Sequence, residues 1–291
     1  MDQAQQLRNV IKKQNQKVIK NAARVITVTS GKGGVGKSNL SVNLAIQFRK
    51  MGKRVVIFDA DFGLANVEVM FGAIPKHNLS DLIYRNMSIE EIITEGPMEI
   101  GFISGGSGIL GLNNLTKEQI QYLVKSMDEL SAITDIIIVD TGAGISDSVL
   151  EFVLASPEVV LVTTPDPSSL TDSYSLLKAV HHHPEFAKQK NRISVVSNRV
   201  NNQEEGKLLF DKLDSVVKQF LEGEIRYLGA IPQDTALERA VRQQKPVSLA
   251  TPNSRSAEAF ESVANAIING TEESVPGKWG ITKLFSKFIN R

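Results

Sequence analysis

The chain has 291 residues, of which 42% are hydrophobic and none is cysteine, and its 33 Lys and Arg nearly balance 32 Asp and Glu. This length allows one large α/β domain with short appendages, and the lack of cysteine excludes disulfides, thiolate metal sites, iron–sulfur clusters and thiol nucleophiles. Since no run of about 18 apolar residues is present to span a membrane, we expect a protein of the cytoplasm.

The first expected element is a short helix near the start of the chain. Asp2 is suited to cap it, and apolar side chains follow at helical spacing at Ala4, Leu7, Val10 and Ile11. Residues 1–24 also carry six basic side chains and one acidic side chain. Because the segment is too short and polar to be stable alone, we expect it to order on a partner, although a frayed leader would have the same composition.

A series of short apolar runs, rich in β-branched residues, follows this segment. The runs lie at residues 25–29, 54–58, 100–103, 136–139, 159–163, 193–196 and 227–231, with longer amphipathic stretches between them. A mostly parallel sheet that is covered on both faces needs such apolar strands separated by helices. The sequence therefore predicts an α/β fold, a doubly wound, mostly parallel sheet with helices on both faces.

A glycine-rich loop comes directly after the first of these strands. It fits the pattern G-x-x-x-x-G-K-[ST] with Gly31, Lys32, Gly33, Gly34, Val35, Gly36, Lys37 and Ser38, and Asn39 follows. In such a loop backbone N–H groups surround the phosphates of a nucleotide, the lysine reaches the β- and γ-phosphates, and the hydroxyl binds Mg²⁺. The loop predicts a nucleotide site, while a glycine-rich turn that matches by chance is the alternative.

Carboxylates follow two of the predicted strands. Asp59 and Asp61 come after the second strand, and Asp140 ends the run at 136–139. Ligands bind at the carboxyl ends of strands in open α/β sheets, and acids two residues apart face the same side of an extended segment. A hydrophobic strand that ends in aspartate is typical of a Walker B motif, so Asp140 is expected to hold Mg²⁺ through water. For Asp59 and Asp61 the alternative is that one of them caps the next helix.

Polar residues also follow the last two strands, at Asn198 and at Pro232-Gln233-Asp234. An asparagine amide can pair with the N6 and N7 edge of adenine. Asparagine and Pro-x-Asp are also common in turns, which leaves a purely structural alternative for both positions.

The last part of the chain predicts a linker and an amphipathic helix. Residues 271–277 hold polar residues and helix breakers, and residues 278–291 carry four basic side chains and no acid, so that the chain between the two basic ends has a net charge of −8. An acidic body disfavours nucleic acid as a partner. The apolar stripe favours insertion into an anionic membrane surface, with packing on the domain as the alternative. Its members are Ile281, Leu284, Phe285, Phe288 and Ile289.

Lys32, at the second position of the glycine-rich loop, gives the loop a deviant Walker A signature, and with it the chain resembles the MinD/ParA group of P-loop ATPases. The resemblance implies ATP or ADP and Mg²⁺ as cofactors, and an ATP-bound homodimer in which Lys32 reaches the partner's phosphates. It implies catalytic roles for Lys32, Lys37 and Asp61, with Asp61 orienting the attacking water and Asp59 supporting the water shell of Mg²⁺.

The resemblance also implies an adenine pocket at Asn198, Pro232 and Asp234. The chain departs from the pattern of the MinD members at switch II, where it has Thr141-Gly142 in place of Ser-Pro. That departure changes the contacts that this loop can make.

The start of the chain, Asp2-Gln3-Ala4-x-x-Leu7-Arg8, resembles the head of the FlhG family of MinD-like regulators of flagellar number and placement. The resemblance implies that Gln3, Leu7 and Arg8 bind the FlhF GTPase and stimulate it, and that flagellar switch-complex (C-ring) proteins and anionic lipids at the cytoplasmic face of the plasma membrane are further partners. The chain is thus expected to have four parts. A partner-activating helix with its linker lies at residues 1–23, the P-loop ATPase domain at 24–270, a second linker at 271–277, and an amphipathic membrane-targeting helix at 278–291. Placement of division inhibitors, DNA partitioning and nucleotide binding without turnover are the alternatives.

Overall fold

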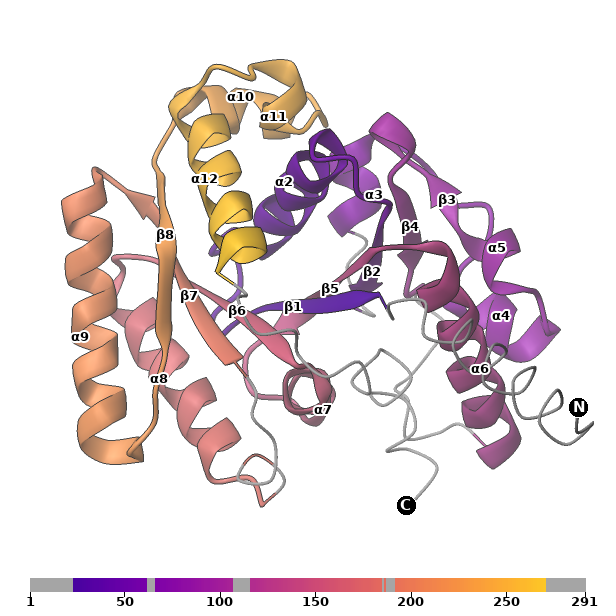
Figure 1. Cartoon of the computed structure of the whole chain (residues 1–291), viewed down its shortest axis with the longest axis horizontal. Coiled ribbons are helices and arrows are strands. Elements are labelled where there is room, and N and C mark those ends of the chain that lie inside the picture. The colour runs from indigo at the N-terminus through magenta and orange to yellow at the C-terminus, as the bar shows by residue number, and fades with distance from the viewer. Residues whose placement is uncertain (1–22, 62–65, 107–115, 185, 187–191, 271–291) are drawn as a thin grey trace, which may run out of the picture.

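The computed structural model of the chain describes residues 23–61, 66–106, 116–184, 186 and 192–270, and the statements below concern these residues (Figure 1). The predicted partner-binding residues of the head and the predicted membrane-binding residues of the tail lie outside the described residues. They are Gln3, Leu7 and Arg8, and Ile281, Leu284, Phe285, Phe288 and Ile289.

Eight described strands form one sheet in the order β3-β4-β2-β5-β1-β6-β7-β8. All neighbouring strands are parallel except β3 and β4, which are antiparallel. The strands are β1 (Arg24–Ser30), β2 (Val55–Ala60), β3 (Thr94–Glu95), β4 (Gly101–Ser104), β5 (Ile136–Ala143), β6 (Glu158–Thr163), β7 (Arg192–Val200) and β8 (Arg226–Pro232).

Helices connect the parallel strands. They are α2 (Lys37–Lys50), α3 (Asn66–Phe71), α4 (Leu79–Arg85), α5 (Ile89–Ile92), α6 (Lys117–Ile133), α7 (Asp147–Ala155), α8 (Pro167–His181), α9 (Gln203–Leu221), α10 (Thr235–Arg242), α11 (Val247–Ala250) and α12 (Arg255–Asn269), with a 3₁₀ turn at Pro97–Glu99.

The helices lie on both faces of the sheet, and alternate residues along the strands pack against the helices of opposite faces. On β5, Ile136 and Ile138 pack in the core with α2, α3 and α10 to α12, whereas Ile137 and Val139 pack with α4 to α7. A third core joins β6 and β7 to α7, α8 and α9. Figure 1 shows α2 and α12 on one side of the sheet and α7 and α8 on the other. The predicted doubly wound α/β fold is confirmed.

Each of the seven predicted runs overlaps a strand, with the runs at 54–58 and 100–103 beginning one residue before β2 and β4, and two further details of the sheet differ from the prediction. Strand β3 was not predicted because it is two residues long and is set by a tight turn, in which Gly96 N donates to Ile100 O. Strand β5 does not end at Asp140 but continues to Ala143, which pairs with Ser30 beyond a register shift in β1.

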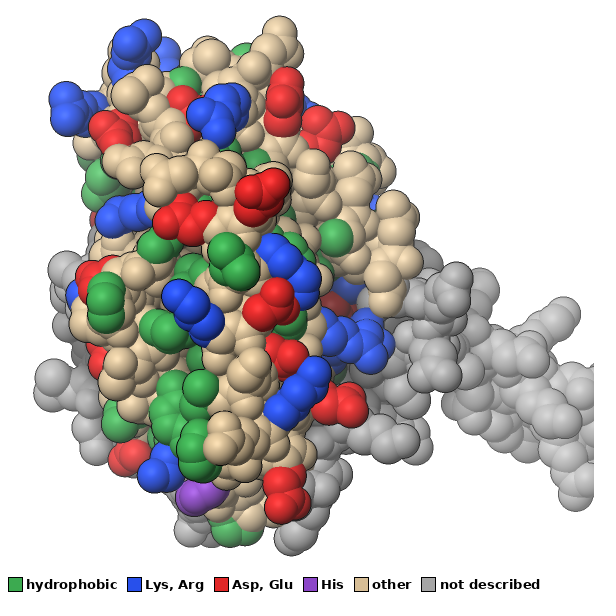
Figure 2. Space-filling view, turned by 90° about the vertical axis from the view of Figure 1, so that its left-hand side faces the viewer, with side chains coloured by type: hydrophobic (Ala, Val, Ile, Leu, Met, Phe, Trp, Pro, Cys, Tyr) green, Lys and Arg blue, Asp and Glu red, His purple; other side chains and the backbone are tan. Residues whose placement is uncertain are grey.

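The outer face of α9 and the edge strand β8 carries acidic and basic side chains side by side, with apolar groups between them (Figure 2). Leu208 and Phe220 on α9 are among the exposed apolar residues. None of the helices in the described ranges combines the length and the apolar character that crossing a membrane needs.

Candidate nucleotide site

The glycine-rich loop joins β1 to α2, at the carboxyl edge of the sheet. Lys37, Ser38 and Asn39 are the first residues of α2, and Gly36 precedes them with a φ of 100°, a conformation that glycine adopts at low cost. At Gly31 an added Cβ would lie 2.1 Å from the backbone carbon of Asp172 in α8. Glycine is thus required at both ends of the loop, at one end by conformation and at the other by close packing.

Buried charges surround this loop. Asp59 on β2 and Asp140 on β5 are register partners on neighbouring strands, and both are buried. Burial lowers the pKa of Lys37, whereas the charges of Asp140 and Asp61 act to raise it. A lysine ammonium and three carboxylates therefore lie within electrostatic reach of one another.

Among the described residues, neither of the two buried carboxylates forms an ion pair within 4 Å, although Lys37 acts on Asp140 from farther away. Burial is the main cause that raises the pKa of Asp59 and of Asp140. The charge of Asp140 raises the pKa of Asp59 further. At Asp140 the hydroxyls of Ser38 and Ser41 and the Lys37 ammonium oppose the rise. Asp140 Oδ2 is buried and has no hydrogen-bond partner among the described residues. A divalent cation would offset this charge.

The donor set fits Mg²⁺ that is shared with a nucleotide. Among the described residues, no three His, Cys, Asp or Glu side chains are grouped so that they could hold a metal ion alone. Mg²⁺ commonly binds one or two protein groups and completes its shell with water and phosphate oxygens. The groups available for this are the Ser38 hydroxyl, as the P-loop pattern predicts, and the Asp140 carboxylate.

Asp59 has a structural role in addition to its place beside Asp140. Its Oδ1 accepts a hydrogen bond from Asp61 N at 3.1 Å, and its Oδ2 accepts one from Val67 N at 3.3 Å, in the first turn of α3. The Asp59 side chain therefore binds a backbone N–H in the first turn of α3, as a helix cap does. Asp61 is half-buried, and its Oδ2 lies 3.4 Å from the amide nitrogen of Asn66.

The departure at switch II has a structural account. The Thr141 hydroxyl is buried and lies 3.1 Å from both Val28 O and the Thr29 hydroxyl on β1. At Gly142 an added Cβ would lie 3.7 Å from Asp61 Oδ1, which is ordinary contact. Thr141 thus joins switch II to β1, the strand that leads into the P-loop, through these hydroxyl contacts. Gly142 lies beside Asp61.

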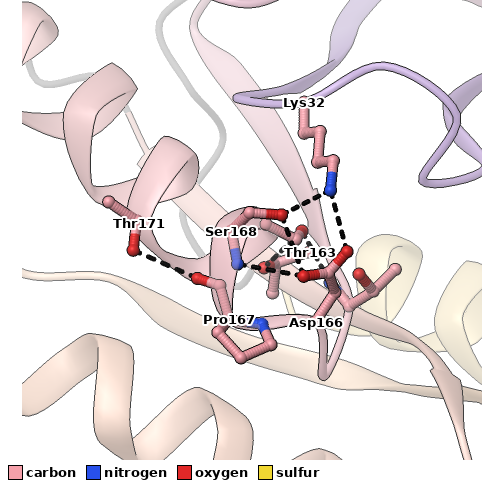
Figure 3. A network of polar contacts seen from close by, with 8 residues as sticks. Lys32, Thr163, Asp166, Pro167, Ser168 and Thr171 are labelled. Carbon is pink, nitrogen blue, oxygen red and sulfur yellow. Dashed lines mark hydrogen bonds and ion pairs between the residues drawn. The ribbon is translucent and has the colours of Figure 1, made fainter.

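Lys32 points away from the loop toward α8 of its own chain (Figure 3). Its Nζ lies 2.8 Å from Asp166 Oδ2 and also donates to the Ser168 hydroxyl. Asp166 caps α8 by accepting a hydrogen bond from Ser168 N. Lys32 and Ser168 hold the pKa of Asp166 down at about 2, and the Lys32 side chain remains 37% exposed. The Asp166 carboxylate is therefore ionised at neutral pH, and its exposed pair with Lys32 is open to competition by phosphate.

A cavity of about 410 Å³ extends from the P-loop between the ends of β7 and β8 and the helix α10. Asn39, Asn198, Pro232 and Asp234 all line it, so the structure brings the residues predicted for the adenine pocket together. The volume is within the range of small-molecule sites. Sequence reasoning missed the wall that α10 contributes through Leu237, Glu238, Val241 and Arg242.

Two predicted adenine-binding side chains are engaged with the protein itself. Asn198 Nδ2 donates to Val35 O in the P-loop at 2.7 Å, and its Oδ1 accepts from Arg199 N. Asp234 caps α10 by accepting from Ala236 N, and its second oxygen accepts from the backbone and hydroxyl of Ser256 in α12. Asp234 thus joins two helices behind the cavity, and Asn198 links the cavity to the P-loop.

The comparisons with known proteins agree with this site. The model of the ParA family, described as NUBPL iron-transfer P-loop NTPase, matches residues 21–268. The antiactivator FleN of Pseudomonas aeruginosa is 39% identical over 244 residues, which cover 84% of this chain and 86% of FleN. The flagellum site-determining protein YlxH of Helicobacter pylori is 35% identical over 296 residues, which cover 99% of this chain and 98% of YlxH.

A solved structure gives the same fold. The septum site-determining protein MinD of Pyrococcus horikoshii, complexed with Mg-ADP, has a TM-score of 0.66 at 23% identity and covers 87% of this chain and 100% of that chain. In the present chain the lack of cysteine removes the usual ligands of iron–sulfur clusters, so iron transfer does not follow from the family description. The chain belongs to the MinD/ParA family of P-loop ATPases, which use ATP and Mg²⁺, and its relatives there include FleN and YlxH.

Proposed function

We propose that the chain is an ATP-dependent dimerising switch that acts at the membrane and regulates flagellar number and placement. The observation that carries this proposal is the 35% identity with a flagellum site-determining protein over 99% of the chain, because that similarity includes the head and the tail as well as the ATPase core. FleN, a relative over the core, is named an antiactivator.

The dimer rests on the placement of Lys32. A lysine at this loop position that is 37% exposed and paired with a surface carboxylate can leave that pair at low cost, since exposed ion pairs contribute little. In the proposed dimer Lys32 reaches the phosphates bound by the partner and supplies a cation in trans, as arginine fingers do. Ile145, 53% exposed in switch II, is an apolar group available for burial on closure.

The residues of each site have separate roles in the proposed cycle. Lys37 and the backbone N–H groups of the loop bind the phosphates, Ser38 and Asp140 hold Mg²⁺ with its waters, and Asp61 orients the attacking water. When bound, Mg²⁺ supplies charge neutralisation between the phosphates and the buried carboxylates. Because Asp61 lies beside Gly142, a change in switch II on hydrolysis would reach the carboxylate directly.

The two basic ends provide the proposed outputs. The tail, with five residues in its apolar stripe and four basic residues, would bind anionic lipid weakly alone and more strongly when a dimer presents two copies. The head would bind the FlhF GTPase, with Gln3 assisting hydrolysis by the partner. Flagellar switch-complex (C-ring) proteins are the proposed target of the assembled dimer.

Gel filtration and liposome flotation with ADP and with ATP test this proposal. With ATP and Mg²⁺, the Asp61→Ala chain should be a dimer that floats with anionic vesicles, and removal of residues 278–291 should abolish flotation but not the dimer. Leu284→Glu should lower flotation, with Leu208→Glu, on exposed α9, as its matched surface control. A chain that stays monomeric with ATP would contradict the switch.

A GTPase assay with FlhF tests the head separately. The intact chain should stimulate GTP hydrolysis, and Gln3→Ala should lose this effect while its own ATP hydrolysis is unchanged. Retardation of non-specific DNA that depends on ATP and on salt would instead favour a DNA-partitioning ATPase.

A further inference from the structure

Ser41 on α2 makes an unusual contact for a helical serine. It lies one turn after Ser38, and its hydroxyl donates to Asp140 Oδ1 on β5 at 2.9 Å. Ser41 is 0% exposed and Asp140 is 1% exposed. No motif in the sequence assigns a role to this serine.

A buried helical serine does not need such a partner. A hydroxyl in a helix can donate to the carbonyl oxygen four residues earlier, which satisfies it locally. In the described helices, Ser126, Ser175, Ser215 and Ser262 donate in this way. Ser41 instead crosses to the strand that carries the predicted Walker B carboxylate.

The two carboxylate oxygens of Asp140 have different surroundings. Oδ1 is occupied by Ser41, whereas Oδ2 is buried with no hydrogen-bond partner among the described residues. A carboxylate that was free to rotate would place either oxygen toward either neighbour. The Ser41 hydrogen bond restrains that rotation, with the Ser38 hydroxyl also acting on Asp140, and Oδ2 is left without a hydrogen bond from any described residue.

We propose that Ser41 is a positioning residue of the Mg²⁺ site, which holds the Asp140 carboxylate in the orientation that leaves Oδ2 for the waters of Mg²⁺. The proposal rests on the ATPase chemistry of the P-loop. Groups that orient metal-binding side chains typically contribute 10- to 100-fold to metal affinity, so roughly this loss is expected when the hydroxyl is removed.

Calorimetry with Mg²⁺ and ADP as probes tests the role of the hydroxyl. Ser41→Thr and Ser41→Val have the same shape, but only threonine keeps the hydroxyl. We expect Ser41→Val and Ser41→Ala to lose roughly 10- to 100-fold in the affinity of the ADP complex for Mg²⁺. Ser41→Thr should retain most of the wild-type affinity, and all three variants should bind ADP in EDTA as the wild type does.

Ser126→Ala is the matched control, because it also removes a buried helical hydroxyl, which donates to Tyr122 O within α6. It should leave Mg²⁺ affinity unchanged. Equal Mg²⁺ affinities in the threonine and valine variants would overturn the role of Ser41, and so would an equal loss of ADP affinity with and without Mg²⁺. If Mg²⁺ had no effect on ADP binding by the wild type, the proposed ATPase switch itself would fail, which is a separate result.

Discussion

Both ends of the central sheet contain charged side chains that are largely buried, but among the described residues only the amino end joins them in an ion pair. At the amino ends, Arg24 on β1 donates to both oxygens of Glu158 on β6 at 2.6 Å and also to Ile267 O at 2.7 Å. At the carboxyl ends, Lys37 lies among acids, and Asp140 Oδ2 has no hydrogen-bond partner in the described part of the chain. One end is complete as it stands, and the other is completed by a ligand.

This difference separates stability from function on a single sheet. A largely buried ion pair that is well hydrogen-bonded resists disruption, because removal of one partner leaves the other charge largely buried. Buried groups without partners are costly in the free protein, and their cost is recovered when a charged ligand binds. Substitutions at the two ends should therefore affect different measurements.

Lys37→Met should give the largest effect. Loss of the ammonium at the phosphates is expected to lower ATP turnover by about 10²- to 10³-fold, in line with removal of one charge-stabilising donor. Thermal unfolding without nucleotide should be little changed or shifted upward, since methionine fills a similar volume without a charge. Lys50→Met at the far end of α2 is the control and should hydrolyse ATP normally.

Glu158→Ala should affect stability and leave hydrolysis intact. Removal of the carboxylate leaves the Arg24 guanidinium, 21% exposed, with one carbonyl partner, and we expect a loss of about 3 kcal/mol in the free energy of unfolding in urea. Lys125→Ala breaks an exposed pair and should cost no more than about 0.5 kcal/mol. A Glu158 variant as stable as the wild type would remove the contrast between the two ends.

Asn198→Ala tests whether the base cavity also supports the P-loop. Without Asn198 the Val35 carbonyl loses its donor, so we expect about tenfold weaker ADP binding, equivalent to one hydrogen bond. Pyrophosphate, which lacks adenine, should bind more weakly as well. Asn198→Asp keeps an acceptor for Arg199 N but not the donor to Val35 O, and it should behave like the alanine variant. Normal pyrophosphate binding would limit Asn198 to the base.

Asp166→Asn should give the smallest effect. Asparagine caps a helix as well as aspartate does, so α8 is retained while the ion pair with Lys32 is lost. We expect the dimer to form at a few-fold lower ATP concentration in sedimentation experiments, with unchanged thermal stability. A higher ATP requirement would mean that Asp166 assists the dimer.

The sequence predicted the nucleotide end of the sheet well because its signals are local. The P-loop spacing and the apolar runs placed Lys37, Asp59 and Asp140 correctly at the carboxyl edge. The contacts that complete the site join distant parts of the chain and leave no local pattern. Asp166 is 134 residues from Lys32, and Ser41 is 99 residues from Asp140.

The capping roles of two acids were also beyond the sequence. Asp59 lies near the end of β2 and Asp234 follows β8, at positions where either a ligand contact or a helix cap is possible. Only the structure shows that Asp59 accepts from Val67 N and Asp234 from Ala236 N. The extension of β5 past Asp140 depends on the buried hydroxyl of Thr141, whose partner on β1 is 113 residues away. Such pairings follow from the fold and not from composition.

The structure of the chain with a non-hydrolysable ATP analogue and Mg²⁺ is the most direct test of the switch. We expect two chains facing each other, with Lys32 of each released from Asp166 and its Nζ against the phosphates bound by the other. A single chain in which Lys32 still contacts Asp166 and Ser168 while the analogue occupies the P-loop would contradict the proposed dimer.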